Sequence, residues 1–204
     1  TYDREAHWVV GATPMMVHLL GGGTRTFRWS FAPSWNTQPT ATWLSLRFSN
    51  RGKGHAPRQA TFLFSGIAFD SSYNVGRAPI DVPIPADAAR VELFTLITGH
   101  GGGGVTNCAE FCNHRHEFTV NGTTYFKEHA EAGTDEGCID EIDNGMTPNQ
   151  GGTWWYGRAG WCPGEQVTPW VVDVTDAVTP GATATVSYRG LFGGLDPPDT
   201  SGNI

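Results

Sequence analysis

A carboxylate lies between two closely spaced cysteines in residues 108–112, Cys-Ala-Glu-Phe-Cys. Four extended residues would span roughly 13 Å, whereas a disulfide needs its Cα atoms about 5.5 Å apart. If Cys108 and Cys112 pair, the segment must therefore form a tight turn with Glu110 near its apex. A carboxylate with so little freedom is a candidate for acid–base catalysis or substrate positioning. The alternative is an exposed glutamate without a role.

Three histidines near this turn could bind a metal ion. His114 and His116 are two residues apart, so on a strand their side chains lie on one face, which continues through Phe118 and Val120. His100, which precedes four glycines, could supply a third imidazole, and three imidazoles suit zinc or copper. The alternative, which we favour, is a hydrogen-bonded, half-buried pair of histidines.

Aromatic side chains gather in the Gly-rich residues 152–164. The faces of Trp155 and Trp161 could stack on sugar rings, and Arg158 could bind a carbonyl or carboxylate. The alternative is that these rings fill the protein core. The glycines at 101–104 lack the lysine of a phosphate-binding loop, and no helix follows them, which argues against nucleotide binding.

The composition of the chain excludes several classes of protein. The 204 residues carry a net charge of −7, which argues against nucleic acid as a partner. No apolar run reaches about 18 residues, so we expect no membrane span. The 27 glycines and 13 prolines disfavour a helical bundle. Four cysteines within residues 108–162 predict two disulfides and an oxidising, extracytoplasmic compartment; free thiols or a metal cluster are the alternatives.

Hydrophobic periodicity predicts an all-β fold of short strands, most often a sandwich. Alternation or continuous apolar runs predict strands at residues 26–31, 44–48, 60–64, 91–97, 171–174 and 183–188. Residues 116–120 and 123–127 flank Asn121-Gly122, which is typical of a type I′ hairpin turn. No segment has the apolar spacing of an amphipathic helix longer than two turns.

Three motifs, in this order, resemble the second domain of the bacterial peptide-N-glycosidase F family. They are a strand that ends in Ile-Thr-Gly-His-Gly (97–101), the Cys-Ala-Glu-Phe-Cys turn (108–112) and the run Arg-Ala-Gly-Trp-Cys-Pro-Gly (158–164). The similarity is dense over residues 90–164 and weaker over residues 66–192. The fold of this family is shared with copper-dependent peptidylglycine monooxygenases.

The resemblance implies antiparallel jelly-roll sandwiches. Residues 1–64 would be the closing strands of an incomplete first domain, and residues 65–204 would be a complete second domain. The implied disulfides join Cys108 to Cys112 and Cys138 to Cys162. The implied location is secreted, periplasmic or at the cell surface.

The activity implied by the resemblance is hydrolysis of the amide between an N-glycan and asparagine, without a cofactor. Glu110 matches the family's functional glutamate, which binds the sugar-proximal part of the substrate, and is the candidate catalytic residue. Arg158 and Trp161 match residues of the cleft between the domains. Together with Trp155 and His100 they are the candidate substrate-binding residues, and the expected ligand is an N-glycan or glycopeptide.

Two departures from the family pattern leave other functions open. The family's principal catalytic aspartate lies in a Cys-rich Asp-Glu-Trp-Asp-Arg segment that this chain lacks, and Asp3 is too close to the following strand to take its role. The chain starts at Thr1 without Met, which is expected of a processed chain or a fragment. Because the aspartate segment is missing, we expect a separate N-terminal chain or segment to complete the first domain.

The second departure is the pair His114 and His116, of which the glycosidases have only the second. The monooxygenases carry a His-x-His on the corresponding strand, where it binds copper. A copper or zinc protein that uses these two histidines and His100 is therefore one alternative function. A glycan- or protein-binding module without catalysis is another.

Overall fold

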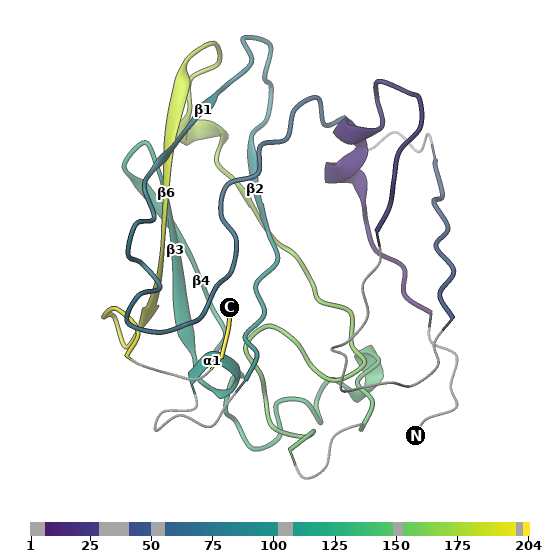
Figure 1. Ribbon diagram of the computed structural model, residues 1–204, viewed down its shortest axis with the longest axis vertical. Helices are drawn as coiled ribbons and strands as arrows, with labels where there is room; N and C mark the ends of the chain where they lie inside the picture. Colours follow the sequence, from purple (N-terminus) through teal and green to yellow (C-terminus); the bar gives the residue numbers. More distant parts are fainter. Residues whose placement is uncertain (1–6, 29–40, 50–55, 102–107, 149–152, 199–201) are drawn as a thin grey trace. The chain divides into compact units, whose positions relative to one another are not determined.

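The computed structural model describes residues 7–28, 41–49, 56–101, 108–148, 153–198 and 202–204. The chain divides into two compact units. The larger unit comprises Thr1–Trp8 and Thr61–Ile204, and the smaller comprises Val9–Ala60. All strands of the described residues lie in the larger unit (Figure 1).

The main sheet of the larger unit has four antiparallel strands in the order β1-β6-β3-β4. These strands are β1 (Ile80–Pro83), β3 (His114–Val120), β4 (Thr123–Glu128) and β6 (Thr183–Phe192). Side chains alternate between buried and half-buried along β3, as expected of a strand with one face on a core. Every residue of β3 pairs with β6, and β3 also pairs with β4 on its other side. The register of β3 is therefore fixed by hydrogen bonds to two neighbouring strands.

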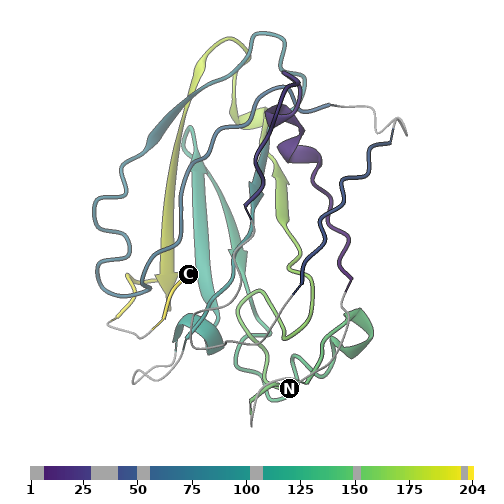
Figure 2. The same cartoon turned by 45° about the vertical axis from the view of Figure 1, so that its right-hand side comes forward.

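A second, two-stranded sheet pairs β2 (Glu92–Thr95) with β5 (Trp170–Asp173). It lies beside the main sheet in the views of Figures 1 and 2. The rings of Phe118 on β3 and Trp170 on β5 are 5.8 Å apart and join the two sheets in one hydrophobic core. The all-β, antiparallel fold class is confirmed, and the jelly-roll connectivity stays a prediction.

The hairpin expected around Asn121-Gly122 is confirmed. Asn121 has φ 47° and Gly122 has φ 89°, and these positive values are required of both central residues of a type I′ turn. Hydrogen-bonded pairing extends outward from Val120–Thr123 to Arg115–Glu128. Local turn chemistry thus sets the register of both strands.

Helical structure among the described residues is limited to single turns and one six-residue segment. These are α1 (Cys108–Phe111) and the 3-10 helices η1 (Thr13–His18), η2 (Ile142–Asn144) and η3 (Thr175–Ala177). No helix of the described part is long and apolar enough to cross a membrane.

The smaller unit, Val9–Ala60, contains η1 but no strand within its described residues. The strand predicted at 44–48 is therefore wrong. The one at 60–64, which continues into the larger unit, is also not a strand, and part of the one at 26–31 lies outside the described residues. Trp43 and Phe48 are 83% and 66% exposed. Alternation shows that a segment can cover a core, but a strand also requires a hydrogen-bonding partner. The division at residues 1–64 and 65–204 stays a prediction.

Candidate functional site

The carboxylate of Glu110 is held from two sides on the single-turn helix α1. Its Oε1 accepts a hydrogen bond of 2.7 Å from Nε of Arg158, and its Oε2 accepts one of 2.9 Å from the backbone N–H of Gly101. The side chain remains 13% exposed. Glu110 therefore has a defined orientation and a path to solvent.

Arg158, the partner of Glu110, is fully buried. Its Nη1 donates to the carbonyl oxygens of Tyr156 and Trp154 at 3.1 and 3.3 Å, and its Nη2 donates to that of Thr153 at 3.0 Å. From the sequence, this guanidinium is expected to contact a substrate directly. That expectation is corrected, because the group is enclosed by its own loop and its donors are directed at protein atoms.

Three segments that are distant in sequence are joined around this ion pair. The N–H of Ala159 donates to the carbonyl oxygen of Glu110, and the N–H of Gly99 donates to that of Ala159, both at 2.9 Å. The indole N–H of Trp161 donates to Gly99 O at 2.6 Å. A Cβ on Gly99 would lie 1.6 Å from Ala109 O, so this close approach requires glycine.

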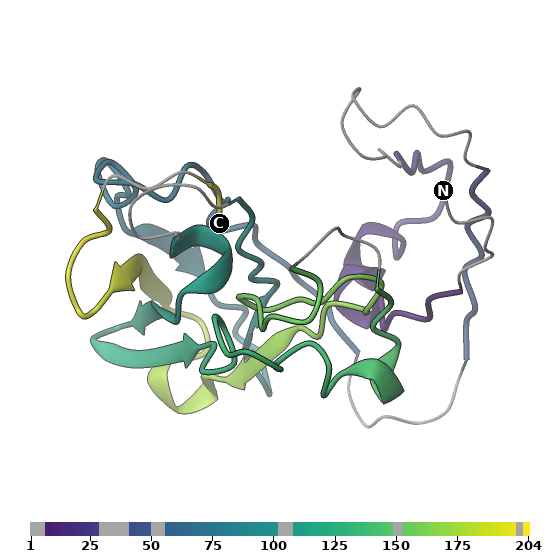
Figure 3. The same cartoon turned by 90° about the horizontal axis from the view of Figure 1, so that it is seen from below.

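The C-terminal end of the chain supports the same region. Asn203 pairs with His100 through two backbone hydrogen bonds of 2.8 and 2.9 Å. Figure 3 shows α1 and the loops formed by residues 129–148 and 153–165. The two groups that contact the Glu110 carboxylate, Arg158 and the N–H of Gly101, therefore belong to loops, and the C-terminal end of the chain pairs with one of these loops.

A disulfide joins Cys138 to Cys162, with Cα atoms 5.6 Å apart, as the resemblance implied. Both residues are buried, with Met146 and Trp154 packed against them. Nη1 of Arg158 lies 3.8 Å from Sγ of Cys138. The bond therefore closes the loop that contains Arg158 and Trp161. The proposed pairing of Cys108 with Cys112 lies outside the described side chains.

Loss of this disulfide is expected to destabilise the larger unit. Replacing both Cys138 and Cys162 by alanine removes a cross-link between residues 24 apart in sequence, and the free energy of unfolding should fall by about 2–5 kcal/mol. Urea denaturation followed by tryptophan fluorescence measures this change. Wild-type protein treated with a thiol reductant should approach the same midpoint. An unchanged midpoint in both would contradict a stabilising role.

Two predicted substrate-binding residues, His100 and Trp161, lie together beside the ion pair. Their ring centroids are 4.7 Å apart, and Nε2 of His100 is 3.0 Å from Oγ1 of Thr98. Burial lowers the pKa of His100, while the Glu110 carboxylate acts in the opposite direction. The centre of the Arg158 guanidinium is 5.0 Å from the Trp161 ring. The site thus combines a carboxylate, a cation and two flat rings.

The third predicted aromatic residue, Trp155, lies between its neighbours on the same loop. Its ring is 5.4 Å from that of Trp154 and 5.5 Å from that of Tyr156. The side chain is half-buried. Trp155 is therefore part of an aromatic row and remains accessible on one side.

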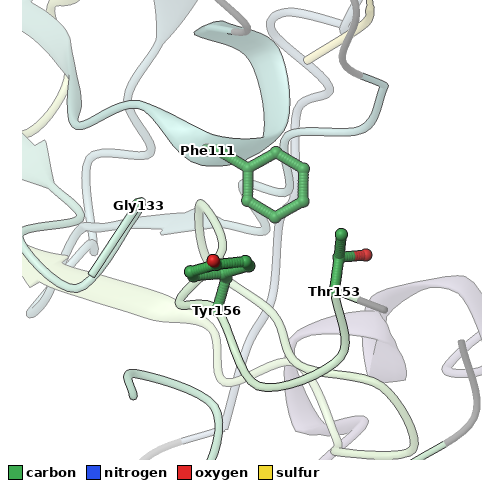
Figure 4. Close-up of a pocket in the computed structure, with 4 residues that line it drawn as sticks. All are labelled: Phe111, Gly133, Thr153 and Tyr156. Atoms are coloured by element: carbon green, nitrogen blue, oxygen red, sulfur yellow. The ribbon is translucent and has the colours of Figure 1, made fainter. Parts of the chain in front are cut away.

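An open pocket of about 260 Å³ adjoins α1 and is lined by Phe111, Gly133, Thr153 and Tyr156. Figure 4 shows the rings of Phe111 and Tyr156 on different sides of this pocket. Their centroids are 6.4 Å apart and their planes nearly perpendicular. Tyr156 belongs to the aromatic run in residues 152–164 that the sequence indicated, whereas Phe111 was not predicted as a site residue, although it directly follows Glu110.

His114 and His116 are completely buried in the main sheet rather than half-buried. Nε2 of His116 lies 3.4 Å from Nδ1 of His114, so the predicted hydrogen-bonded pair is present. His100 is exposed and bonds elsewhere. In the part of the chain that the structure describes, no three His, Cys, Asp or Glu side chains are grouped to hold a metal ion. The three histidines that could have formed a metal site are therefore not grouped in this structure, and a metal ion stays an alternative hypothesis.

Burial of His116 should make the protein acid-sensitive. Burial, and then the nearby His114 and His129, hold the pKa of His116 well below its ordinary value of 6.5. Below pH 6.5 the unfolded chain therefore binds a proton that the folded chain does not. The free energy of unfolding should fall by up to about 1.4 kcal/mol per pH unit as the pH decreases.

The measurement that checks this is urea denaturation at several pH values between 7 and 5. In the His116→Asn variant the slope of stability against pH should be shallower, whatever its stability at pH 7. Equal slopes in variant and wild type would show that His116 does not carry the effect.

The larger unit is an antiparallel β protein in which a disulfide-closed loop holds Arg158 against the carboxylate of Glu110. Residues 68–201 match the family model described as "Peptide-N-glycosidase F, C terminal", and the chain belongs to this family. The matched residues lie entirely within the larger unit.

The chain is also similar to individual proteins of known name. The chain is 29% identical over 129 residues to "Peptide-N(4)-(N-acetyl-beta-D-glucosaminyl)asparagine amidase F" of Elizabethkingia miricola, which covers 61% of this chain and 34% of the relative. A solved structure of PNGase F from Flavobacterium meningosepticum has a TM-score of 0.48 and 19% identity, over 69% of this chain and 48% of that one. The chain thus spans about a third of the curated relative and about half of the solved structure.

Proposed function

We propose that this chain is the C-terminal portion of an amidase of the peptide-N-glycosidase F type, which hydrolyses the bond between an N-glycan and asparagine. The observation that carries the proposal is the orientation of Glu110, whose two carboxylate oxygens are held by Arg158 and Gly101 while the side chain stays accessible. Family membership and the name of the curated relative support the same reaction.

The chemistry requires a group of this kind. Hydrolysis of the glycan–asparagine amide adds water, leaves an aspartate carboxylate on the peptide and releases the sugar as a glycosylamine. An amide is a poor electrophile, so the reaction needs acid–base groups and preorganised hydrogen-bond partners. In our proposal Glu110 binds the sugar-proximal part of the substrate and polarises the amide or its attacking water. Arg158 acts through Glu110 and is a positioning residue.

The aromatic residues near Glu110 are suited to sugar binding. Trp161 and His100 lie next to the ion pair, and Trp155 follows along the loop. The flat faces of such rings pack against the C–H faces of pyranose rings, and their polar edges can hydrogen bond. We assign these three residues to binding of the glycan core.

A further polypeptide segment completes the site in this proposal. The aspartate that the resemblance implies belongs to a motif that the chain lacks. In the smaller unit, the described residues Trp43, Leu44 and Phe48 are more than half exposed. Large apolar side chains in this state favour coverage by another segment, which we propose supplies the missing strands and the aspartate. The buried disulfide supports an oxidising, extracytoplasmic location.

The proposal separates binding from hydrolysis, and the test uses this separation. The chain alone should bind an N-glycopeptide, measured by calorimetry, and should not bind the same peptide without its glycan. In the longer protein that contains it, mass spectrometry should show conversion of the glycosylated asparagine to aspartate. Absence of both glycan binding and conversion would refute the proposal. Binding without conversion by the longer protein would favour a glycan-binding module.

A further inference from the structure

Four buried side chains form a continuous hydrogen-bonded chain through the core of the larger unit. The hydroxyls of Tyr73 and Tyr188 are 2.8 Å apart, and that of Tyr188 is 2.7 Å from Nδ1 of His116. Nε2 of His116 is 3.4 Å from Nδ1 of His114, whose Nε2 is 3.1 Å from the carbonyl oxygen of Ala109. We call these four side chains the core relay. All four are buried.

The last acceptor sets the direction of every bond in the core relay. A carbonyl oxygen only accepts, so Nε2 of His114 carries the proton and its Nδ1 is an acceptor. Nε2–H of His116 then donates to that Nδ1, and its own Nδ1 accepts from the Tyr188 hydroxyl. Tyr73 donates to Tyr188 in turn. The geometry is thus satisfied by two neutral histidines in the same tautomer.

The core relay ends on the helix that carries Glu110. A helix of one turn such as α1 is not stable by itself, because the conformational entropy lost in forming the first turn outweighs the free energy of its few hydrogen bonds. Its shape must therefore come from tertiary contacts. The carbonyl of Ala109 accepts from His114, and the next carbonyl, that of Glu110, accepts from the N–H of Ala159. These two bonds fix consecutive peptide groups of α1.

We propose that His114 is a positioning residue for Glu110: its Nε2–H holds α1 in place through Ala109, while His116, Tyr188 and Tyr73 select the tautomer that makes this bond. The catalytic consequence rests on the proposed amidase function, whereas the structural consequence does not. Histidine is suited to this task because it has two ring nitrogens: Nε2 donates to Ala109 of α1, while Nδ1 accepts from His116 on the same strand.

The test compares two substitutions that differ in the donor at one position. His114→Phe keeps a flat ring and removes the donor, whereas in His114→Gln the side-chain amide can donate from a similar position. The readout is hydrogen exchange of the Arg158 Nε–H, which is bonded to Glu110, followed by NMR. Because a hydrogen bond is worth about 1 kcal/mol net, exchange should be about three- to tenfold faster in His114→Phe. It should stay near wild type in His114→Gln.

A matched control separates positioning from general destabilisation. Val120→Ala removes packing from the same face of β3 but removes no atom that takes part in the hydrogen bonds of the core relay, so the Arg158 Nε–H should exchange at the wild-type rate. Equal acceleration in Val120→Ala and His114→Phe would overturn the proposal. So would unchanged exchange in His114→Phe.

Wild-type protein provides a test that does not depend on folding of the variants. Nitrogen-15 chemical shifts should report both His114 and His116 as Nε2–H tautomers at neutral pH. A His114 protonated at Nδ1 could not donate to Ala109 and would overturn the proposal. None of these measurements needs a glycan, so their failure is distinguishable from failure of the amidase proposal. If both proposals hold, glycopeptide affinity should fall in His114→Phe and be retained in His114→Gln.

Discussion

Replacing Arg158 by methionine is expected to lower the free energy of unfolding by about 3–5 kcal/mol. The substitution keeps much of the aliphatic volume of a fully buried side chain but leaves the Glu110 carboxylate without its cation. It also leaves the carbonyl oxygens of Thr153, Trp154 and Tyr156 without the donors that now satisfy them. Partly buried acceptors that lose their donors add to the cost. Urea denaturation of wild type and variant measures the difference.

The same substitution at an exposed arginine is the control. Arg189 is paired with Asp196 at 2.9 Å, but the two side chains are 56% and 60% exposed. Because water screens such pairs, Arg189→Met should cost no more than about 1 kcal/mol. In a double-mutant cycle, Glu110→Gln combined with Arg158→Met should cost less than the sum of the two single changes. Equal effects at Arg158 and Arg189 would show that burial does not strengthen the Arg158 pair.

Those parts of the fold that depend on local chemistry could be predicted from the sequence. Asn121-Gly122 specifies its own turn because both residues tolerate positive φ. The inward face of β3 follows from period-two alternation, and His114, His116, Phe118 and Val120 are all buried. Residues 44–48 show the same alternation but form no strand. A strand also needs a neighbouring strand to pair with, and alternation within one segment does not show whether such a partner exists.

The position of a side chain within the candidate site was harder to predict than its identity. The resemblance named Glu110, Trp161 and His100 as site residues, and in the structure they lie around Arg158 and its loop. Arginine is rarely buried, and only the fold reveals three carbonyl oxygens and a carboxylate around Arg158. Alternation on β6 indicates that Tyr188 faces inward, but its bond to His116 follows from the pairing of β6 with β3.

Replacing Glu110 by glutamine is expected to reduce kcat/KM for N-glycopeptide hydrolysis by about 10²–10³-fold in the longer protein that contains this chain. Glutamine has the same shape and can still accept from Nε of Arg158. Its amide group would face the N–H of Gly101, however, where two donors cannot bond. The variant therefore loses both the negative charge and the orientation that the wild-type carboxylate has. Steady-state assays with a defined glycopeptide, read by mass spectrometry, measure the loss.

The control for this experiment is Glu117→Gln, on β3. Glu117 is bonded to Arg115 on the same strand at 2.7 Å and lies on the face of β3 opposite to His114, so the same loss of charge should leave kcat/KM within about twofold of wild type. Thermal unfolding of each variant shows the fraction folded at the assay temperature, and rates are compared per folded molecule. If Glu110 only binds the sugar, KM should rise while kcat is retained. A fall in kcat would place the carboxylate's effect in the transition state, because only interactions that strengthen there accelerate the reaction.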